Sequence, residues 1–209
     1  MYGGYCSPVV FPVCGGLNEG RYIFNNKEYS MMQHGFARFK EFEVEALKND
    51  EAVFLLKSND EIKEIYPFDF EFRVGFKLKD KKLYITYSVK NVSDDKIYFS
   101  FGGHEGYACP EGAEEYIIKF ENDDFLIRHM LSGGFFDGKI EEIKLRIGFP
   151  EHNTLAIWTL PSRKYVCIEP WCGVSEKKDL TAILPKKTAL LLLMQIKHLK
   201  DAILLRFYN

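Results

Sequence analysis

The chain has 209 residues, a hydrophobic fraction of 46% and a formal net charge of −2. Acidic and basic residues are interspersed, so no basic surface is available for a phosphate backbone or an anionic membrane, which argues against nucleic-acid and membrane partners. The five cysteines form no CxxC pair, and we expect reduced thiols and a cytoplasmic location. This length predicts one domain over residues 1–209.

The first third of the chain predicts short strands and one short helix. Strand patterns bounded by turn residues cover Arg21–Phe24, Phe42–Ala46 and Ala52–Lys57. Ser58–Ile65 is expected to be helical, because Ser58 and Glu61 have the spacing of a capping box.

A strand with one wet face is predicted over Phe68–Leu78, where apolar residues occupy every second position. The alternation returns over Leu83–Val89 after the polar turn 79–82, which predicts an antiparallel hairpin. Ile97–Phe101 is expected to form the next strand.

Further strands are predicted in the second half of the chain, at Glu115–Phe120, Phe125–Met130, Thr154–Leu160 and Lys164–Glu169. The apolar segment Thr188–Phe207 cannot be assigned to helix or strand by periodicity alone. Many short strands with regular turns favour an all-β, antiparallel β-sandwich with few short helices.

The first candidate for chemistry is His104, which follows the predicted strand ending at Phe101 and two glycines. Glycines let a ligand approach the backbone, and an imidazole titrates near neutral pH, so His104 could act as a general acid. A lone histidine beside glycines more often has a structural role, and the local sequence alone favours that alternative.

The second candidate is Glu169, which is followed by Pro170 and Trp171 at the end of an apolar strand. Partial burial would raise the pKa of the Glu169 carboxyl toward the range of a general base, and the Trp171 ring offers a flat face for a sugar. An ordinary ion pair with a basic neighbour is the alternative interpretation of Glu169.

A third cluster combines an amide, an imidazole and a guanidinium in the loop that holds Gln33, His34 and Arg38. Such groups bind hydroxyls, and Arg38 could also hold a phosphate by paired contacts. The alternative is a surface loop in which Arg38 pairs with a nearby acid. A metal site would need His34, His104 and either His129 or Glu105 to converge, but their spacing matches no metal-ligand pattern, and no metal or cofactor is predicted.

Together, the segments HGFAR at 34–38, SFGGHEGYACP at 100–110, LIRHMLSGGFFDGK at 126–139 and CIEPWCG at 167–173 resemble the aldose 1-epimerase (galactose mutarotase-like) superfamily. The resemblance is to the branch often associated with lactose operons, and it runs from about residue 7 to about residue 175. It implies a β-sandwich of the supersandwich type that binds an aldohexose and interconverts its α and β anomers without a cofactor.

The resemblance also implies a role for each candidate residue. His104 would protonate the ring oxygen, and Glu169 would take the proton of the anomeric hydroxyl. His34 would bind the substrate and polarise the reacting oxygens, and Arg38 would be a further ligand contact.

The chain departs from the family pattern at four places. It begins without the expected first strands, and it has Gly16 where relatives carry an arginine. A stretch between Lys144 and Asn153 is shortened, and residues from Thr181 onward look like an unrelated apolar tail. Missing strands would leave a sheet edge uncovered, so we expect a homodimer or lowered stability, which light scattering and thermal melting would test.

Two other functions are compatible with these departures. The chain could be a sugar-binding or regulatory domain with weakened turnover, which the loss of the arginine favours. It could also act on a hexose 6-phosphate, with Arg38 holding the phosphate.

Overall fold

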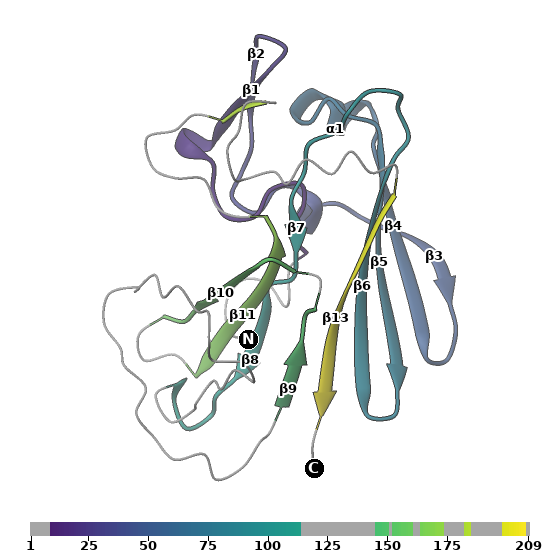
Figure 1. Cartoon of the computed structure of the whole chain (residues 1–209), viewed down its shortest axis with the longest axis vertical. Coiled ribbons are helices and arrows are strands. Elements are labelled where there is room, and N and C mark those ends of the chain that lie inside the picture. Colours follow the sequence, from purple (N-terminus) through teal and green to yellow (C-terminus); the bar gives the residue numbers. More distant parts are fainter. Residues whose placement is uncertain are drawn as a thin grey trace.

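The computed structural model describes residues 9–113, 145–150, 152–160, 164–173, 182–184 and 198–207, which build three β-sheets (Figure 1). The three-stranded sheet has the order β12 (Ala182–Leu184), β1 (Arg21–Phe24) and β2 (Lys27–Ser30). The four-stranded sheet has the order β10 (Thr154–Trp158), β11 (Tyr165–Cys172) and β7 (Phe101–Gly102), with β8 (Glu105–Ala108) also paired to β11. The six-stranded sheet has the order β3 (Glu43–Leu47), β4 (Glu51–Lys57), β5 (Phe70–Lys79), β6 (Lys82–Asn91), β13 (His198–Phe207) and β9 (Leu145–Gly148).

The strand pairs are antiparallel apart from β1 with β12, so the predicted all-β, antiparallel class is confirmed. The described residues contain one α-helix, α1 (Asp60–Ile65), and the 3-10 turns Asn18–Gly20 and Ala37–Phe39. A search of the same residues for a helix that is long and apolar enough to cross a membrane finds none.

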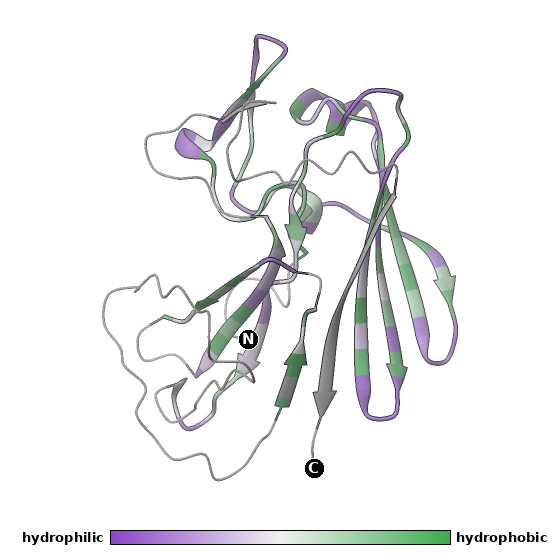
Figure 2. Cartoon of the chain, in the orientation of Figure 1, coloured by the Kyte–Doolittle hydropathy of each residue, from purple (hydrophilic) through white to green (hydrophobic). Residues whose placement is uncertain are grey.

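The predicted hairpin is present as β5 and β6. Their pairing runs from Phe70 opposite Asn91 to Lys79 opposite Lys82. Asp80 and Lys81 join the strands with φ of 50° and 56°, as a two-residue hairpin turn requires. Alternate residues of β5 are buried, including Phe72 and Val74, and Figure 2 shows apolar and polar residues alternating along this hairpin.

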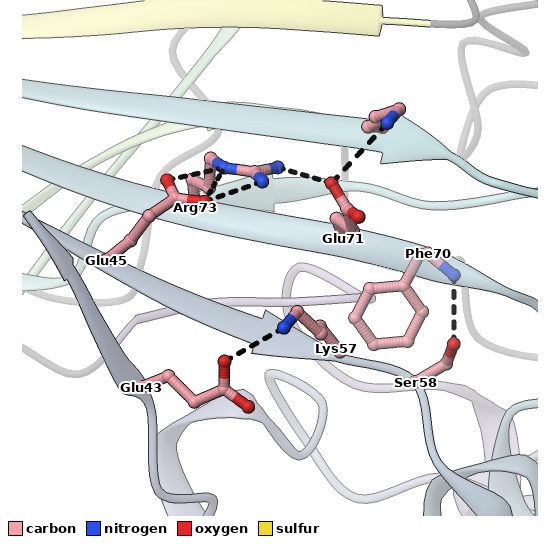
Figure 3. Close-up of polar contacts among 8 residues, drawn as sticks. Glu43, Glu45, Lys57, Ser58, Phe70, Glu71 and Arg73 are labelled. Carbon is pink, nitrogen blue, oxygen red and sulfur yellow. Dashed lines mark hydrogen bonds and ion pairs between the residues drawn. The ribbon is translucent and has the colours of Figure 1, made fainter.

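The polar residues of the six-stranded sheet form ion pairs on its solvent-facing side (Figure 3). The Arg73 guanidinium contacts the carboxylates of Glu45 and Glu71, and Lys57 pairs with Glu43. Exposed pairs of this kind each stabilise a fold by less than about 1 kcal/mol, but their charges keep this face of the sheet exposed to solvent. The opposite face is therefore left for the core.

The main core packs aromatic rings of β5 and β6 against the segment that contains Phe11. The Phe11 ring stacks on the Phe72 ring with centroids 4.4 Å apart and an interplanar angle of 12°. Phe11 is fully buried, so the irregular chain on either side of it is anchored to the large sheet.

Two local predictions were wrong. The helix is capped by Asn59, whose Oδ1 accepts the Ile62 N–H at 2.9 Å, whereas the Ser58 hydroxyl accepts the Phe70 N–H. The predicted strand Ile97–Phe101 is strand only from Phe101, because Ser100 N–H donates to the Pro12 carbonyl in an irregular segment instead of to a strand.

The C-terminal segment is part of the large sheet instead of being an unrelated tail. Strand β13 lies between β6 and β9, with His198 opposite Lys90 and Arg206 opposite Lys82. The strands predicted at Glu115–Phe120 and Phe125–Met130 lie outside the described residues, as does the segment 185–197.

Candidate active site

His34 lies in a loop that is hydrogen-bonded to the segment around Phe11. The His34 N–H donates to the Gly15 carbonyl at 2.8 Å, and the His34 carbonyl accepts the Phe11 N–H at 3.3 Å. His34 adopts a left-handed φ of 64°, and its side chain is 7% exposed. The loop therefore holds the imidazole in place through its backbone.

Gly35 makes this loop geometry feasible. Its φ is 71°, and a Cβ at this position would lie 2.1 Å from the Phe11 carbonyl oxygen. No side chain can occupy that space without moving the backbone, so Gly35 allows the His34 loop to pack directly on the anchored segment.

Glu169 is an interior residue of β11 and lies opposite Ala156 of β10. The strand had been predicted to end at Glu169, but it continues through Pro170 to Cys172. The Glu169 side chain is 1% exposed. The carboxyl is thus fixed by a rigid strand and is removed from bulk water.

His104 follows β7 and brings its imidazole against Glu169. Gly102, in β7, packs so closely on β11 that a Cβ there would lie 2.4 Å from the Pro170 carbonyl oxygen. Nε2 of His104 lies 3.2 Å from Oε1 of Glu169. The two residues predicted to be the acid and the base are therefore in direct contact.

Burial shifts the pKa values of this pair in opposite directions. It raises the pKa of Glu169 to about 8, and the nearby indoles of Trp158 and Trp171 oppose the rise only in part. It lowers the pKa of His104 below its usual range, helped by the positive charge of Arg38. At neutral pH the pair accordingly holds one proton between its two members.

His34 stands beside this pair as a neutral hydrogen-bond donor. Its ring centroid is 5.0 Å from that of His104, at an interplanar angle of 79°. Burial, then the charges of His104 and Arg38, lower the pKa of His34 to about 4. Nδ1 of His34 accepts the Gly15 N–H at 3.2 Å, so the neutral ring carries its proton on Nε2.

The donor atoms of His34, His104 and Glu169 lie within 4.8 Å of one another, which is close enough to consider a metal ion. The His34 tautomer opposes that use. A metal at Nε2 would move the ring proton to Nδ1, where it would face the N–H of Gly15. The site is better suited to donating and accepting protons than to coordination.

The other predicted binding residues occupy different positions around the three central side chains. Arg38 is half-buried, donates to the Gln33 carbonyl at 2.9 Å and lies over the Phe39 ring, and its charge reaches both histidines. The Gln33 side chain is exposed. Trp171 is only 7% exposed, and its ring meets that of His34 at 5.8 Å.

Two residues of the site were not singled out for these roles from the sequence. The Trp158 and His104 ring centroids are 6.1 Å apart, at an interplanar angle of 89°. Trp158 lies in a predicted strand, β10, which pairs with β11, and this was the sequence feature that could have indicated its role. Glu105 is 7% exposed, and burial raises the pKa of its carboxyl to about 7. A carboxyl directly after His104 had been considered only as a metal ligand.

Sequence comparison finds a matching family and related proteins. Residues 1–144 match the aldose 1-epimerase family. The plasmid-encoded LacX protein of Lactococcus lactis subsp. lactis is 23% identical over an alignment with a length of 246 residues. The alignment covers 88% of this chain and 82% of LacX. This relative agrees with the lactose-operon-associated branch expected from the sequence.

Solved structures share the fold across nearly the whole chain. A galactose mutarotase related enzyme from Lactobacillus acidophilus has a TM-score of 0.69 at 22% identity, covering 97% of this chain and 83% of that one. A galactose mutarotase-like protein from Lactobacillus casei has a TM-score of 0.69 at 20% identity, with coverages of 97% and 85%. The expected galactose mutarotase-like fold is confirmed.

Proposed function

The chain belongs to the aldose 1-epimerase family, and we propose that it interconverts the α and β anomers of an aldohexose by acid–base ring opening. The contact of 3.2 Å between Nε2 of His104 and Oε1 of Glu169 carries this proposal. An anomeric carbon bears the ring oxygen and the hydroxyl oxygen together, so the two groups that exchange protons with them must be neighbours. Residues 1–209 would form one carbohydrate-binding domain.

The single proton of the pair suits both directions of the reaction. Ring opening starts from the form of the pair that has its proton on His104, which burial makes the minor form at neutral pH. The imidazolium gives this proton to the ring oxygen while the Glu169 carboxylate takes the proton of the anomeric hydroxyl. The bond between the anomeric carbon and the ring oxygen breaks, leaving an open-chain aldehyde. The protein then holds a neutral imidazole and a carboxylic acid, so its proton count is unchanged.

Reclosure uses the same two groups with their roles exchanged. Rotation about the bond next to the aldehyde carbon presents its other face to the sugar hydroxyl. His104 takes the proton from that hydroxyl, and Glu169 protonates the carbonyl oxygen. This regenerates the starting ion pair, and no metal or cofactor is needed.

His34 would stabilise the oxygen on which charge develops. Its Nε2–H is available for donation because the Gly15 N–H occupies Nδ1. With its pKa lowered to about 4, His34 stays neutral at working pH and cannot compete with His104 as the acid. Arg38 would add a contact to a substrate hydroxyl.

Polarimetry of freshly dissolved α-D-galactose and α-D-glucose tests this function. We expect the protein to accelerate the change in rotation, and Glu169→Gln to remove the acceleration. Glu45→Gln is the matched control, because Glu45 is on the solvent-facing side of the large sheet and pairs with Arg73. Spontaneous rates with the unmodified protein would contradict the proposal.

One observation favours a sugar-binding domain as a second candidate. Gly16 stands where the resemblance expects a substrate-holding arginine, and a Cβ there would have no neighbour within 4 Å. If galactose or glucose raises the melting temperature while the rotation changes only at the spontaneous rate, binding without turnover is the function. A rate enhancement seen only with glucose 6-phosphate, and lost in Arg38→Ala, would instead identify a hexose-6-phosphate 1-epimerase.

A further inference from the structure

Trp158 lies on the face of the four-stranded sheet that carries Glu169. Strands β10 and β11 lie side by side (Figure 1). In this ladder, Trp158 is opposite Cys167 and Ala156 is opposite Glu169. Opposed residues of an antiparallel pair share a face, and residues two apart along a strand do so as well. Trp158 is therefore a diagonal neighbour of the Glu169 carboxyl, and the small side chain of Ala156 fills little of the space beside it.

Trp158 touches both members of the acid–base pair. Its indole meets the imidazole of His104 edge to face, at 6.1 Å and 89°. The indole also lies close enough to the Glu169 carboxyl to oppose the rise of its pKa. Nδ1 of His104 has no hydrogen-bond partner among the described residues, so the imidazole is oriented by its Nε2 contact with Glu169 and by ring contacts with Trp158 and His34.

Trp171 is engaged differently, although it lies on the same face of β11. It packs with Val10 and Cys14 in a small buried cluster and is 7% exposed. Its ring is thus committed to joining the sheet to the irregular segment around Phe11. Trp158 is half-buried, which leaves part of its ring for a ligand.

We propose that Trp158, in place of Trp171, is the aromatic wall against which the sugar stacks and the positioning residue that orients His104 over Glu169. This inference rests on the proposed function and names a specificity element of the same site. The C–H face of a pyranose packs well on an indole, and the edge-to-face contact restricts rotation of the imidazole. The indole N–H, near the Glu169 carboxyl, favours the charged form that ring opening requires.

The chain contains only two tryptophans, so fluorescence can report on each one alone. Trp171→Phe leaves Trp158 as the emitter, and Trp158→Phe leaves Trp171. With galactose or glucose at concentrations that saturate the unmodified protein by calorimetry, we expect a change in emission from Trp171→Phe. Unchanged emission from that variant, at concentrations where calorimetry shows that it binds sugar, would overturn the proposal.

Kinetics separate the stacking role from the positioning role. Trp158→Phe keeps a ring but lacks the N–H, so kcat should fall roughly tenfold with KM nearly unchanged. Its alkaline pH limit should also move upward, because the indole no longer favours the Glu169 carboxylate, and a purely structural role would not move this limit. Trp158→Leu should raise KM roughly tenfold in addition. Unaltered KM, kcat and pH limit in both variants would refute the role of Trp158.

The failure of this inference can be told apart from the failure of the proposed function. A protein that binds sugar but leaves its anomers at the spontaneous rate has no epimerase activity, yet its Trp158 emission still responds if the ring is the wall. A protein that accelerates mutarotation equally well as Trp158→Leu has the activity without this wall, which overturns the inference alone.

Discussion

Glu105 lies opposite Ile168 in the β8–β11 ladder, and Ile168 directly precedes Glu169 in β11. Because successive residues of a strand point to opposite faces, the carboxyl groups of Glu105 and Glu169 lie on opposite faces of the sheet. Both carboxyls are buried, with exposed fractions of 7% and 1%. The charge of Glu105 adds to the effect of burial in raising the pKa of Glu169. The sheet thus places a second titrating carboxyl behind the one proposed as the base.

Glu105→Gln should move the alkaline limit of activity to lower pH. The productive one-proton state of the His104–Glu169 pair ends when pH rises through the pKa of Glu169, about 8. Without a negative charge behind it, Glu169 ionises at lower pH, so kcat/KM should decline earlier on the alkaline side. The pH dependence of the polarimetric rate measures this shift.

The acidic limit serves as an internal control for the same variant. His104 sets that limit, because a second proton on the pair removes the carboxylate. Burial is the main cause of its lowered pKa, and burial is unchanged in Glu105→Gln. An alkaline limit that stays in place, or moves to higher pH, would show that Glu105 has no such influence.

Glu169→Gln should stabilise the fold at alkaline pH while removing activity. The folded-state pKa, about 8, is above the ordinary value of 4.5, so the unfolded chain releases this proton first as pH rises. The free energy of unfolding therefore falls between about pH 4.5 and pH 8, and the amide avoids that loss. At pH 8.5 the difference between these two pKa values corresponds to a gain of about 4–5 kcal/mol, or about 8–20 °C in Tm.

Thermal melting at two pH values tests this prediction. At pH 4 the Glu169 carboxyl is protonated in the folded protein and largely so in the unfolded chain. Glu169→Gln and the unmodified protein should therefore melt within about 1 °C of each other. An equal increase in the Tm of Glu169→Gln at pH 4 and pH 8.5 would show that the substitution acts through packing instead of ionisation.

His34→Asn should lower kcat/KM by about 10²-fold and leave the fold intact. Asparagine tolerates the left-handed φ of 64° at this position, but its shorter side chain cannot present a donor where Nε2–H does now. Met32→Ala, at a half-exposed residue of the same loop, is the control and should retain full activity. Equal rates for His34→Asn and the unmodified protein would exclude His34 from the reaction.

Gly35→Ala should destabilise the protein by about 3 kcal/mol or more. The added Cβ would lie 2.1 Å from the Phe11 carbonyl oxygen at a φ of 71°, so the loop and the anchored segment must separate. Gly16→Ala is a matched control, since its Cβ would meet nothing within 4 Å. Urea unfolding should show a large loss for the first variant and less than about 1 kcal/mol for the second; similar losses would contradict this account of the loop.

The regular parts of the fold were predictable because their causes are local. Phe68–Leu78 alternates apolar and polar residues, and the turn after it is polar, so the β5–β6 hairpin follows from period and turn chemistry alone. The same locality misled the prediction of the α1 cap, which was assigned to Ser58 although Asn59 caps the helix. Tertiary context decides between them, because Ser58 is bonded to Phe70.

Features that depend on distant partners were not predictable. Strand β13 owes its conformation to pairing with β6, which no periodicity in its own residues indicates. Trp158 and Trp171 share a face, and what distinguishes them is the packing of Trp171 on Val10 and Cys14. His104 and Glu169 were named as partners through a family resemblance, whereas the charge shifts that follow from their burial required the structure.

A double-mutant cycle on the mutarotation rate tests most directly whether His104 and Glu169 act as one proton-exchanging unit. His104→Asn, Glu169→Gln and the double variant are compared with the unmodified protein by polarimetry of α-D-galactose. We expect each single variant to lose nearly all catalysis and the double variant to lose no more, because the reaction needs both groups at once. Losses that multiply in the double variant would mean that the two residues act independently, which would contradict the mechanism.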